Sequence, residues 1–195
     1  MIRTALLSIT LFSSLALAQT TQPAERKTYT EPPKMQIDTG KHYTATIDTS
    51  AGKIVVELFP KDAPKTVNSF VTLSRDNFFN GTIFHRVIPG FMIQGGDPTG
   101  TDMGGPGYKF ENENRDTTHT YSTGTLGMAN SGPDTNGSQF FIMDADTPLP
   151  PHDYTIFGQV KEGQDVVHKI ATAERDQNDR PNNPVSINAV TIKED

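Results

Sequence analysis

The sequence of 195 residues predicts one mainly β domain, a barrel or a sandwich with two helices, behind an export signal and a tether. Two observations predict this class. Many short apolar or alternating stretches are separated by Gly-rich turns, and only two stretches have a convincing helical pattern. Periodicity alone does not separate a barrel from a sandwich. Because the chain has no cysteine, its stability must come from an apolar core and not from disulfides.

The N-terminal 18 residues have the features of a secretory signal peptide. Arg3 precedes an apolar stretch at residues 5–17, and Ala16-Leu17-Ala18 is a small-residue cleavage pattern. An uncleaved membrane anchor is the alternative, although the apolar stretch is shorter than the ~20 residues that span a bilayer. We expect an exported protein, periplasmic or secreted, that has no membrane association in its mature form.

Residues 19–40 are polar and rich in proline, which predicts a flexible tether before a folded domain at residues 41–195. The domain begins with HYTATIDT at residues 42–49, whose alternation places Tyr43, Ala45 and Ile47 on one face. A turn at residues 50–53 leads into IVVELF at residues 54–59. These features predict a β-hairpin.

The stretch KDAPKTVNSFVTLSR at residues 61–75 predicts the first helix, because Pro64 fits its first turn and apolar residues recur at helical spacing. Its inner face is expected to contain Val67, Phe70, Val71 and Ser74. The Gly-rich stretch at residues 95–107 predicts a long loop, and long loops inside compact domains are usually functional.

Short strands are expected at residues 126–129, 139–143 and 156–160, followed by a helix at 165–171. That helix should turn Val166, Val167 and Ile170 inward. The last stretch, VSINAVTI at residues 185–192, changes phase between Ile187 and Val190, which predicts a β-bulge in the final strand.

Charge and motif content argue against several function classes. The formal net charge of −6 is unfavourable for binding a phosphate backbone, so no nucleic-acid partner is expected. The sequence contains no HExxH pair, no EF-hand loop and no Walker lysine, and Ser138 is not in a G-x-S-x-G elbow. Asp144 and Asp146 are interpreted as part of a solvated turn. We therefore expect no metal and no cofactor.

Two stretches combine apolar bulk with isolated polar groups: FHRVIPGFMIQGGD at residues 84–97 and LGMANSGPDTNGSQFFIMDADTP at residues 126–148. Buried arginine is rare unless its charge has a partner, so a cation in such a stretch indicates a specific role. Apolar pockets with a few fixed donors suit a peptide-binding groove. The candidate polar residues are Arg86, Gln94, Asn130 and Gln139, and the candidate apolar residues are Phe91, Met92 and Phe141.

The register of the hairpin around Pro89-Gly90 decides which of these side chains share a face. A two-residue loop would place Arg86 opposite Ile93, whereas a three-residue loop ending at Phe91 would place Arg86 opposite Gln94. Only the second register puts Arg86, Met92 and Gln94 on one face. We predict that register.

Together, these two stretches resemble the cyclophilin family of peptidyl-prolyl cis/trans isomerases, and the likeness runs from about Tyr43 to Ile192. The resemblance implies a closed eight-stranded antiparallel barrel with two capping helices. Because side chains fill the interior of so small a barrel, the active groove should lie on its outside. A bacterial, exported, monomeric member that assists protein folding is expected, with proline-containing polypeptides as its partners.

The resemblance also implies roles for individual residues. Arg86 matches the catalytic arginine, Gln94 matches the amide that orients the arginine and the substrate, and Phe91 belongs to the same catalytic group. Substrate binding is implied for Met92, Met103, Ala129, Asn130, Gln139, Phe141, Leu149 and Tyr154.

Four positions, Met103, Leu149, Pro150 and Tyr154, depart from the family pattern. Leu149 stands where many eukaryotic members carry Trp, and Tyr154 stands where they carry His. Members without that Trp tend to bind cyclosporin weakly, so weak cyclosporin binding is expected. Met103 lies at the gate of a second pocket, where a long flexible side chain could narrow the entrance.

The implied chemistry explains why an arginine is needed. Resonance opposes rotation of a peptide bond by ~18–20 kcal/mol, and the X-Pro isomers interconvert slowly. In the twisted transition state the lone pair returns to nitrogen, so a hydrogen bond donated by Arg86 favours that state over the planar one.

Two alternative functions differ in testable ways. A proline-peptide binding module would use the same groove without turnover. A small-ligand barrel of the lipocalin type would need a hollow interior, which dense packing of Val56, Phe84 and Ile142 would exclude.

Overall fold

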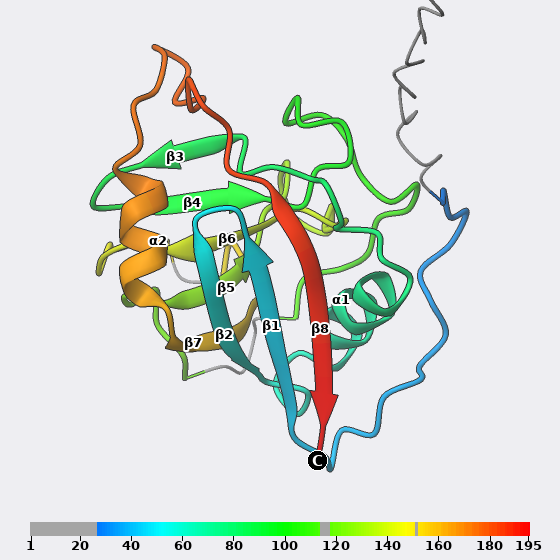
Figure 1. Cartoon of the computed structure of the whole chain (residues 1–195). Coiled ribbons are helices and arrows are strands. Elements are labelled where there is room, and N and C mark those ends of the chain that lie inside the picture. The colour runs from blue at the N-terminus through cyan, green and yellow to red at the C-terminus, as the bar shows by residue number, and fades with distance from the viewer. Residues whose placement is uncertain (1–26, 114–117, 151) are drawn as a thin grey trace, which may run out of the picture.

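A computed structural model of the chain describes residues 27–113, 118–150 and 152–195. Eight antiparallel strands form one sheet in the order β3-β4-β6-β5-β7-β2-β1-β8, with two helices against it (Figure 1). The elements are β1 Tyr43–Thr49, β2 Gly52–Leu58, α1 Pro64–Arg75, β3 Arg86–Ile88, β4 Met92–Gly95, β5 Thr125–Met128, β6 Phe140–Met143, β7 Ile156–Glu162, α2 Gln164–Ala171 and β8 Ile187–Glu194. The predicted signal peptide lies outside the described residues.

The first hairpin and the first helix form largely where the sequence predicts them. Alternate residues of β1 are buried, with Tyr43, Ala45 and Ile47 facing the core. Helix α1 begins at Pro64, which lies in its first turn as predicted. The preceding residues form a turn in which the Asp62 and Ala63 amides donate to the Phe59 carbonyl. Proline at the first helical position has no amide hydrogen to leave unsatisfied.

The predicted bulge in the last strand is confirmed. Asp48 pairs with Ala189 whereas the next residue, Thr49, pairs with Ile187, so Asn188 is the extra residue of β8. In the second helix Val167 and Ile170 are buried as expected, and Val166 is partly buried against the same core.

The closed barrel expected from the family resemblance is wrong for this structure, because the sheet is curved but open between β3 and β8. An isolated bridge between Ile83 and Ser186 lies in that gap. The physical reason is the length and pairing of β3. This strand has three residues, and its Val87 amide donates to the backbone carbonyl of Asp179 in the loop before β8.

The interior of the curved sheet is filled with side chains. Val56, Phe84 and Ile142 have no solvent exposure, which excludes the hollow interior that a lipocalin-type function would require. In Figure 1 the two helices lie on opposite sides of the molecule, α1 beside β8 and α2 beside β2 and β4. A second, smaller apolar cluster, formed by Met92, Phe141 and Met143, lies apart from this core.

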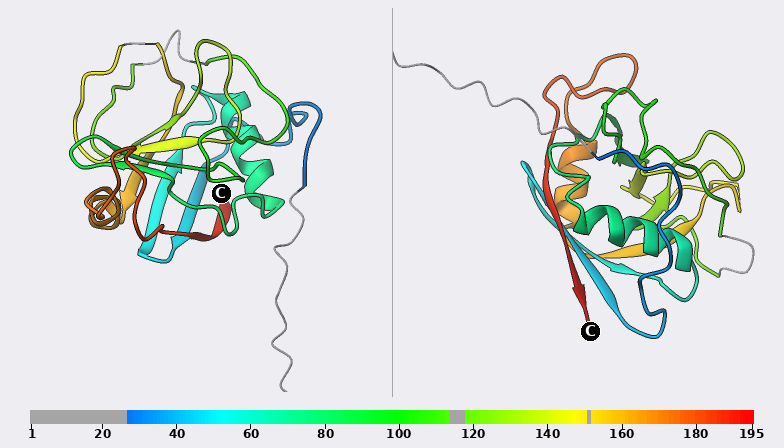
Figure 2. Two further views of the ribbon diagram at one scale, coloured as in Figure 1. Left: turned by 90° about the horizontal axis from the view of Figure 1, so that it is seen from above. Right: turned by 90° about the vertical axis from the view of Figure 1, so that its right-hand side faces the viewer.

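The segment of residues 27–40, expected to be part of a flexible tether, packs against the domain. Figures 1 and 2 show it in blue beside α1. Asn68 of α1 is buried and its side-chain amide donates to the carbonyls of Pro33 and Lys34, while Ile37 joins the core. Buried polar groups need such partners, so this part of the expected tether belongs to the folded unit. Residues 19–26 lie outside the described residues.

Within the described part of the chain, neither helix has the length and apolarity needed to cross a bilayer.

Candidate active site

The β3–β4 hairpin has the predicted register. Arg86 pairs with Gln94 and Ile88 pairs with Met92, which leaves Pro89, Gly90 and Phe91 as the loop. Gly90 has a φ of 70°, a left-handed conformation that glycine adopts without steric cost. The Gly90 amide donates to the Asp144 carboxylate at 2.7 Å, and the Asp144 amide donates to the Phe91 carbonyl at 2.8 Å. These bonds attach the loop to the end of β6.

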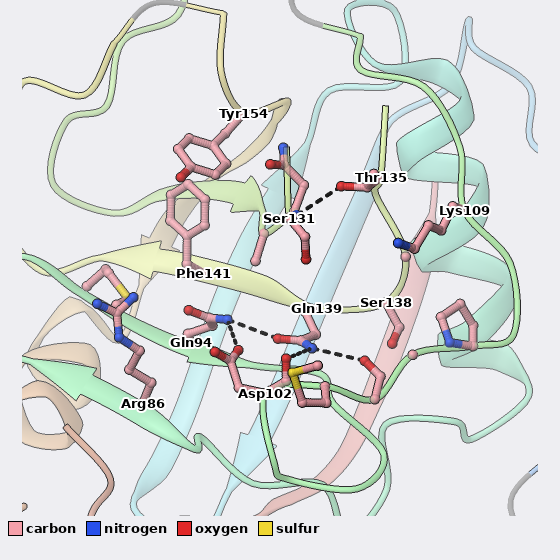
Figure 3. Close-up of a pocket in the computed structure, with 18 of the residues that line it drawn as sticks. Arg86, Gln94, Asp102, Lys109, Ser131, Thr135, Ser138, Gln139, Phe141 and Tyr154 are labelled. Atoms are coloured by element: carbon pink, nitrogen blue, oxygen red, sulfur yellow. Dashed lines mark hydrogen bonds between the residues drawn. The ribbon is translucent and has the colours of Figure 1, made fainter. Parts of the chain in front are cut away.

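The hairpin lines a cavity of about 680 Å³ on the outside of the sheet, called the main cavity below (Figure 3). Every site residue predicted from the sequence lines it. These are Arg86, Phe91, Met92, Gln94, Met103, Ala129, Asn130, Gln139, Phe141, Leu149 and Tyr154.

One end of the main cavity is apolar. The Phe141 and Tyr154 rings meet edge to face, with centroids 5.5 Å apart at 84°. Tyr121 supports this wall from behind, because its hydroxyl donates to the Tyr154 carbonyl at 2.9 Å. Gly127 leaves room for Phe141, since a Cβ there would lie 2.4 Å from the ring. These contacts fix the aromatic side chains at this end of the main cavity.

The other end of the main cavity contains a network of amides and a carboxylate. The Gln94 side-chain amide donates to Asp102 at 2.8 Å and to the Gln139 side-chain oxygen at 2.9 Å. Gln139 in turn donates to the Gly104 carbonyl at 2.9 Å (Figure 3). Buried His85 contacts the same Asp102 oxygen at 3.1 Å. The network fixes the two glutamine side chains, which rotate freely when unbonded.

Arg86 lies at the edge of the main cavity, and its partner is a carboxylate instead of the Gln94 amide that was expected to orient it. In this structure Gln94 bonds to Asp102 and Gln139, while the Arg86 Nε lies 3.7 Å from an Asp179 carboxylate oxygen. Asp179 also accepts from Arg175 at 3.1 Å. The Arg86 side chain is 40% exposed, so this ion pair is weak and the guanidinium keeps donors available for a ligand.

The Gly-rich loop between residues 95 and 107 is organised by a buried carboxylate. Asp97 accepts bonds from the Thr99 amide and hydroxyl and from the amides of Thr101 and Gly104. Burial alone would raise the pKa of Asp97, but these hydrogen bonds lower it below its usual value. The loop carries Met103 to the rim of the main cavity, where the side chain is 89% exposed. Met103 is therefore a solvent-exposed residue at the rim of the main cavity.

Asn130 has its side chain engaged within the protein. Its amide donates to the Asp153 carbonyl at 2.9 Å, and its side-chain oxygen accepts from the Gly132 amide at 3.1 Å. These bonds hold the segment after β5 in a turn that borders the main cavity. The Asn130 side chain thus already makes two hydrogen bonds within the protein.

Several residues of the site were missed by sequence reasoning. Asp102 and Asp179 each have a positive φ, at 73° and 61°, inside loops where an aspartate gives no periodic signal. Tyr121 and Tyr108 were not singled out because isolated aromatics outside strands are common. The remaining lining residues that were missed include Gly104, Pro106, Lys109, Ser131, Thr135 and Ser138. A local hint existed only for the Gly-rich loop, which was expected to be functional.

A family model and the sequence relatives indicate the same protein family. A family model described as "Cyclophilin type peptidyl-prolyl cis-trans isomerase/CLD" matches residues 44–192. The chain is 48% identical over 166 residues to a probable peptidyl-prolyl cis-trans isomerase A of Mycobacterium leprae, covering 76% of this chain and 91% of the relative. It is also 48% identical over 144 residues to a peptidyl-prolyl cis-trans isomerase of Schizosaccharomyces pombe, covering 72% and 93%.

Solved structures agree with the sequence relatives. A Cryptosporidium parvum cyclophilin-type peptidyl-prolyl cis-trans isomerase superposes with a TM-score of 0.75 at 35% identity, covering 79% of this chain and 99% of that one. The same parasite protein solved in the presence of the dipeptide Ala-Pro superposes with a TM-score of 0.73, also at 35% identity, covering 78% and 99%.

Proposed function

This chain belongs to the family of cyclophilin-type peptidyl-prolyl cis-trans isomerases, and from that premise we propose that the main cavity is its catalytic groove. The proposed substrates are proline-containing polypeptides. The observation that carries the assignment is that the Arg86 guanidinium and the aromatic pocket of Phe141 and Tyr154 line the same cavity on the outer face of the sheet. The hairpin register places Arg86, Met92 and Gln94 on the side of Phe141.

Arg86 is proposed to act on the twisted amide. Rotation about the X-Pro bond breaks amide resonance and returns the lone pair to the prolyl nitrogen. A guanidinium that donates a hydrogen bond to this nitrogen stabilises the twisted state more than either planar isomer. No bond is made or broken in the substrate, so Arg86 needs only a fixed position and an unchanged charge.

The walls of the main cavity are proposed to place the amide against Arg86. Phe141, Met92 and Leu149 would hold the proline ring and exclude water, which strengthens the field of the nearby cation. Gln94 and Gln139 would present fixed amides to the peptide backbone. Because their side chains are already bonded to Asp102 and Gly104, little reorganisation is needed when a substrate binds.

A protease-coupled assay with a short X-Pro peptide tests the isomerase activity directly. We expect the slow phase of cleavage, which reports cis-to-trans conversion, to accelerate in proportion to the protein concentration. A protein that binds the peptide without accelerating this phase would instead be a proline-peptide binding module. Intact Arg86 at the edge of the cavity favours turnover over simple binding.

We also propose that the protein is a bacterial, exported isomerase acting periplasmically or after secretion. The support is the sequence of residues 1–18, with Arg3 before an apolar stretch and Ala16-Leu17-Ala18 at its end. Expression of the full chain in a secretion-competent bacterium should yield a mature protein beginning at Gln19 in the exported fraction, measured by N-terminal sequencing. A cytoplasmic protein that retains Met1 would contradict the proposal.

Weak cyclosporin binding is expected from the residue at the rim of the aromatic pocket. Leu149 is apolar and has no side-chain hydrogen-bond donor, whereas tryptophan at this place would offer an indole N–H and a larger surface. Inhibition of the peptide assay by cyclosporin should therefore need a higher concentration for the wild type than for Leu149→Trp. Equal inhibition of both proteins, or tight inhibition of the wild type, would contradict this expectation.

A further inference from the structure

An N-terminal strap, residues 27–37, lies outside the stretch that matches the family and still contacts residues that line the main cavity. The family match begins at residue 44, whereas the strap runs beside α1 toward the Gly-rich loop (Figure 2). Its two ends are attached differently. Ile37 is buried in the core and the Gln36 amide donates to Asn68, whereas Tyr29 at the other end contacts the loop that walls the cavity.

Tyr29 contacts the back of the cavity wall through its backbone. Its amide donates to the Pro106 carbonyl at 2.9 Å. Its carbonyl oxygen lies so close to Gly107 that a Cβ there would be 2.1 Å away, and Gly107 has a φ of 103°. Pro106 is wedged on its other side against Gly137, where a Cβ would lie 3.2 Å from the proline ring. Pro106, Gly107 and Gly137 all line the main cavity.

The Tyr29 side chain makes a second attachment to the same wall. Its ring packs edge to face on Tyr108, with centroids 6.1 Å apart at 82°, and Tyr108 lines the cavity while its hydroxyl bonds Ser69 at 2.8 Å. The Tyr29 hydroxyl donates to Asp76 at 2.6 Å, and Lys27 pairs with the same carboxylate at 2.7 Å. Burial, followed by the bond to Asp76, raises the pKa of Tyr29, so its hydroxyl stays a donor at neutral pH.

Gly104, at the start of this wall, is bonded to Asp97 and Gln139, and Tyr29 holds the wall further along at Pro106. Residues 104–107 read Gly-Gly-Pro-Gly and lie outside the strands and helices. Glycine-rich irregular backbone loses more conformational entropy on ordering than other sequences, so its position depends on contacts made by its neighbours. Tyr29 supplies a backbone hydrogen bond and an aromatic contact on the side of this wall that faces away from the cavity.

We propose that the N-terminal strap is a positioning element of the catalytic groove, with Tyr29 setting the place of the Pro106–Tyr108 wall. This inference rests on the proposed function of the main cavity. The strap touches neither Arg86 nor the aromatic pocket. It therefore controls which peptide residues flanking the proline are accepted, and leaves the rotation step itself unchanged.

The test compares Tyr29→Ala and a mature chain lacking residues 19–37 with the wild type. Each is assayed on a panel of X-Pro peptides that differ in the two residues before proline. We expect KM to rise three- to tenfold for bulky flanking residues and to change less than twofold for alanine, with kcat retained. Tyr29→Phe keeps the ring that Tyr29→Ala removes, so it should restore most of the wild-type preference.

Met35→Ala provides the matched control, because Met35 belongs to the strap and is 52% exposed. This variant should leave both KM and kcat unchanged. If the deletion fails to fold, Tyr29→Ala alone decides. Unchanged peptide preference in folded Tyr29→Ala, or an equal loss of kcat on all peptides, would overturn the role of the strap. An inactive wild type would instead overturn the proposed function.

Discussion

Replacing Arg86 with alanine is expected to lower kcat/KM for an X-Pro peptide by about two to three orders of magnitude. This is the typical effect of removing one preorganised donor that acts mainly on the transition state. KM should change little, because the aromatic pocket formed by Phe141 and Tyr154 stays in place. Arg86→Lys should recover only part of the rate, since an ammonium lacks the planar fork of the guanidinium. The protease-coupled assay measures both variants.

Arg75→Ala serves as the control for loss of a surface arginine. The Arg75 side chain is 44% exposed, close to the 40% of Arg86, and it pairs with Glu194 at 2.7 Å at the end of α1. This variant should keep the wild-type rate and, at most, lose a few tenths of a kcal/mol of stability. Near-equal rates for wild type and Arg86→Ala would remove Arg86 from the mechanism and favour a binding module.

Phe140→Ala is expected to lower the free energy of unfolding by about 3–5 kcal/mol, as large-to-small changes at buried phenylalanines do. Phe140 has no solvent exposure and meets three rings edge to face. They are Phe70 and Phe79, each at 5.7 Å, and Phe84 at 6.3 Å. The cavity left behind cannot collapse easily because it is enclosed by other rigid rings. Urea or guanidinium unfolding, followed by circular dichroism, gives the change.

Phe141→Ala is the contrasting variant on the next residue of the same strand. Phe141 points to the opposite face, lines the main cavity and belongs to the smaller cluster with Met92 and Met143. Its removal should cost clearly less stability than removal of Phe140, while KM for proline peptides should rise at least tenfold. If the two variants lost equal stability and equal affinity, the division between core face and binding face would be wrong.

Local sequence patterns predicted the parts of the site that depend on spacing. The register of the hairpin could be predicted from residues 86–94 alone. Only a three-residue loop keeps Arg86, Met92 and Gln94 on one face. Phe141 and Gln139 were candidates because they lie in a second apolar stretch with isolated amides, and their place in the groove was implied by the family resemblance. The phase change between Ile187 and Val190 likewise revealed the bulge.

Partners that come from distant loops gave no such signal. Asp102 and Asp179 reach Gln94 and Arg86 from irregular segments, where an acidic residue is usually solvated. The contact between Tyr29 and Pro106 joins a proline-rich segment, which by composition resembles a tether, to the wall of the main cavity. The position of this segment depends on the burial of Ile37 and on the hydrogen bonds of Asn68, and composition predicts neither of them.

The sequence by itself determined the β-rich architecture and the hairpin register, because alternation and loop length are local properties. Its resemblance to the family indicated eleven of the residues that line the main cavity. Only the tertiary structure decided that the sheet stays open between β3 and β8 and that Asp179 is the carboxylate beside Arg86. It also decided that residues 27–37 belong to the folded unit. These features depend on contacts between backbone groups and charges that are distant in the sequence. Local periodicity carries no information about such contacts.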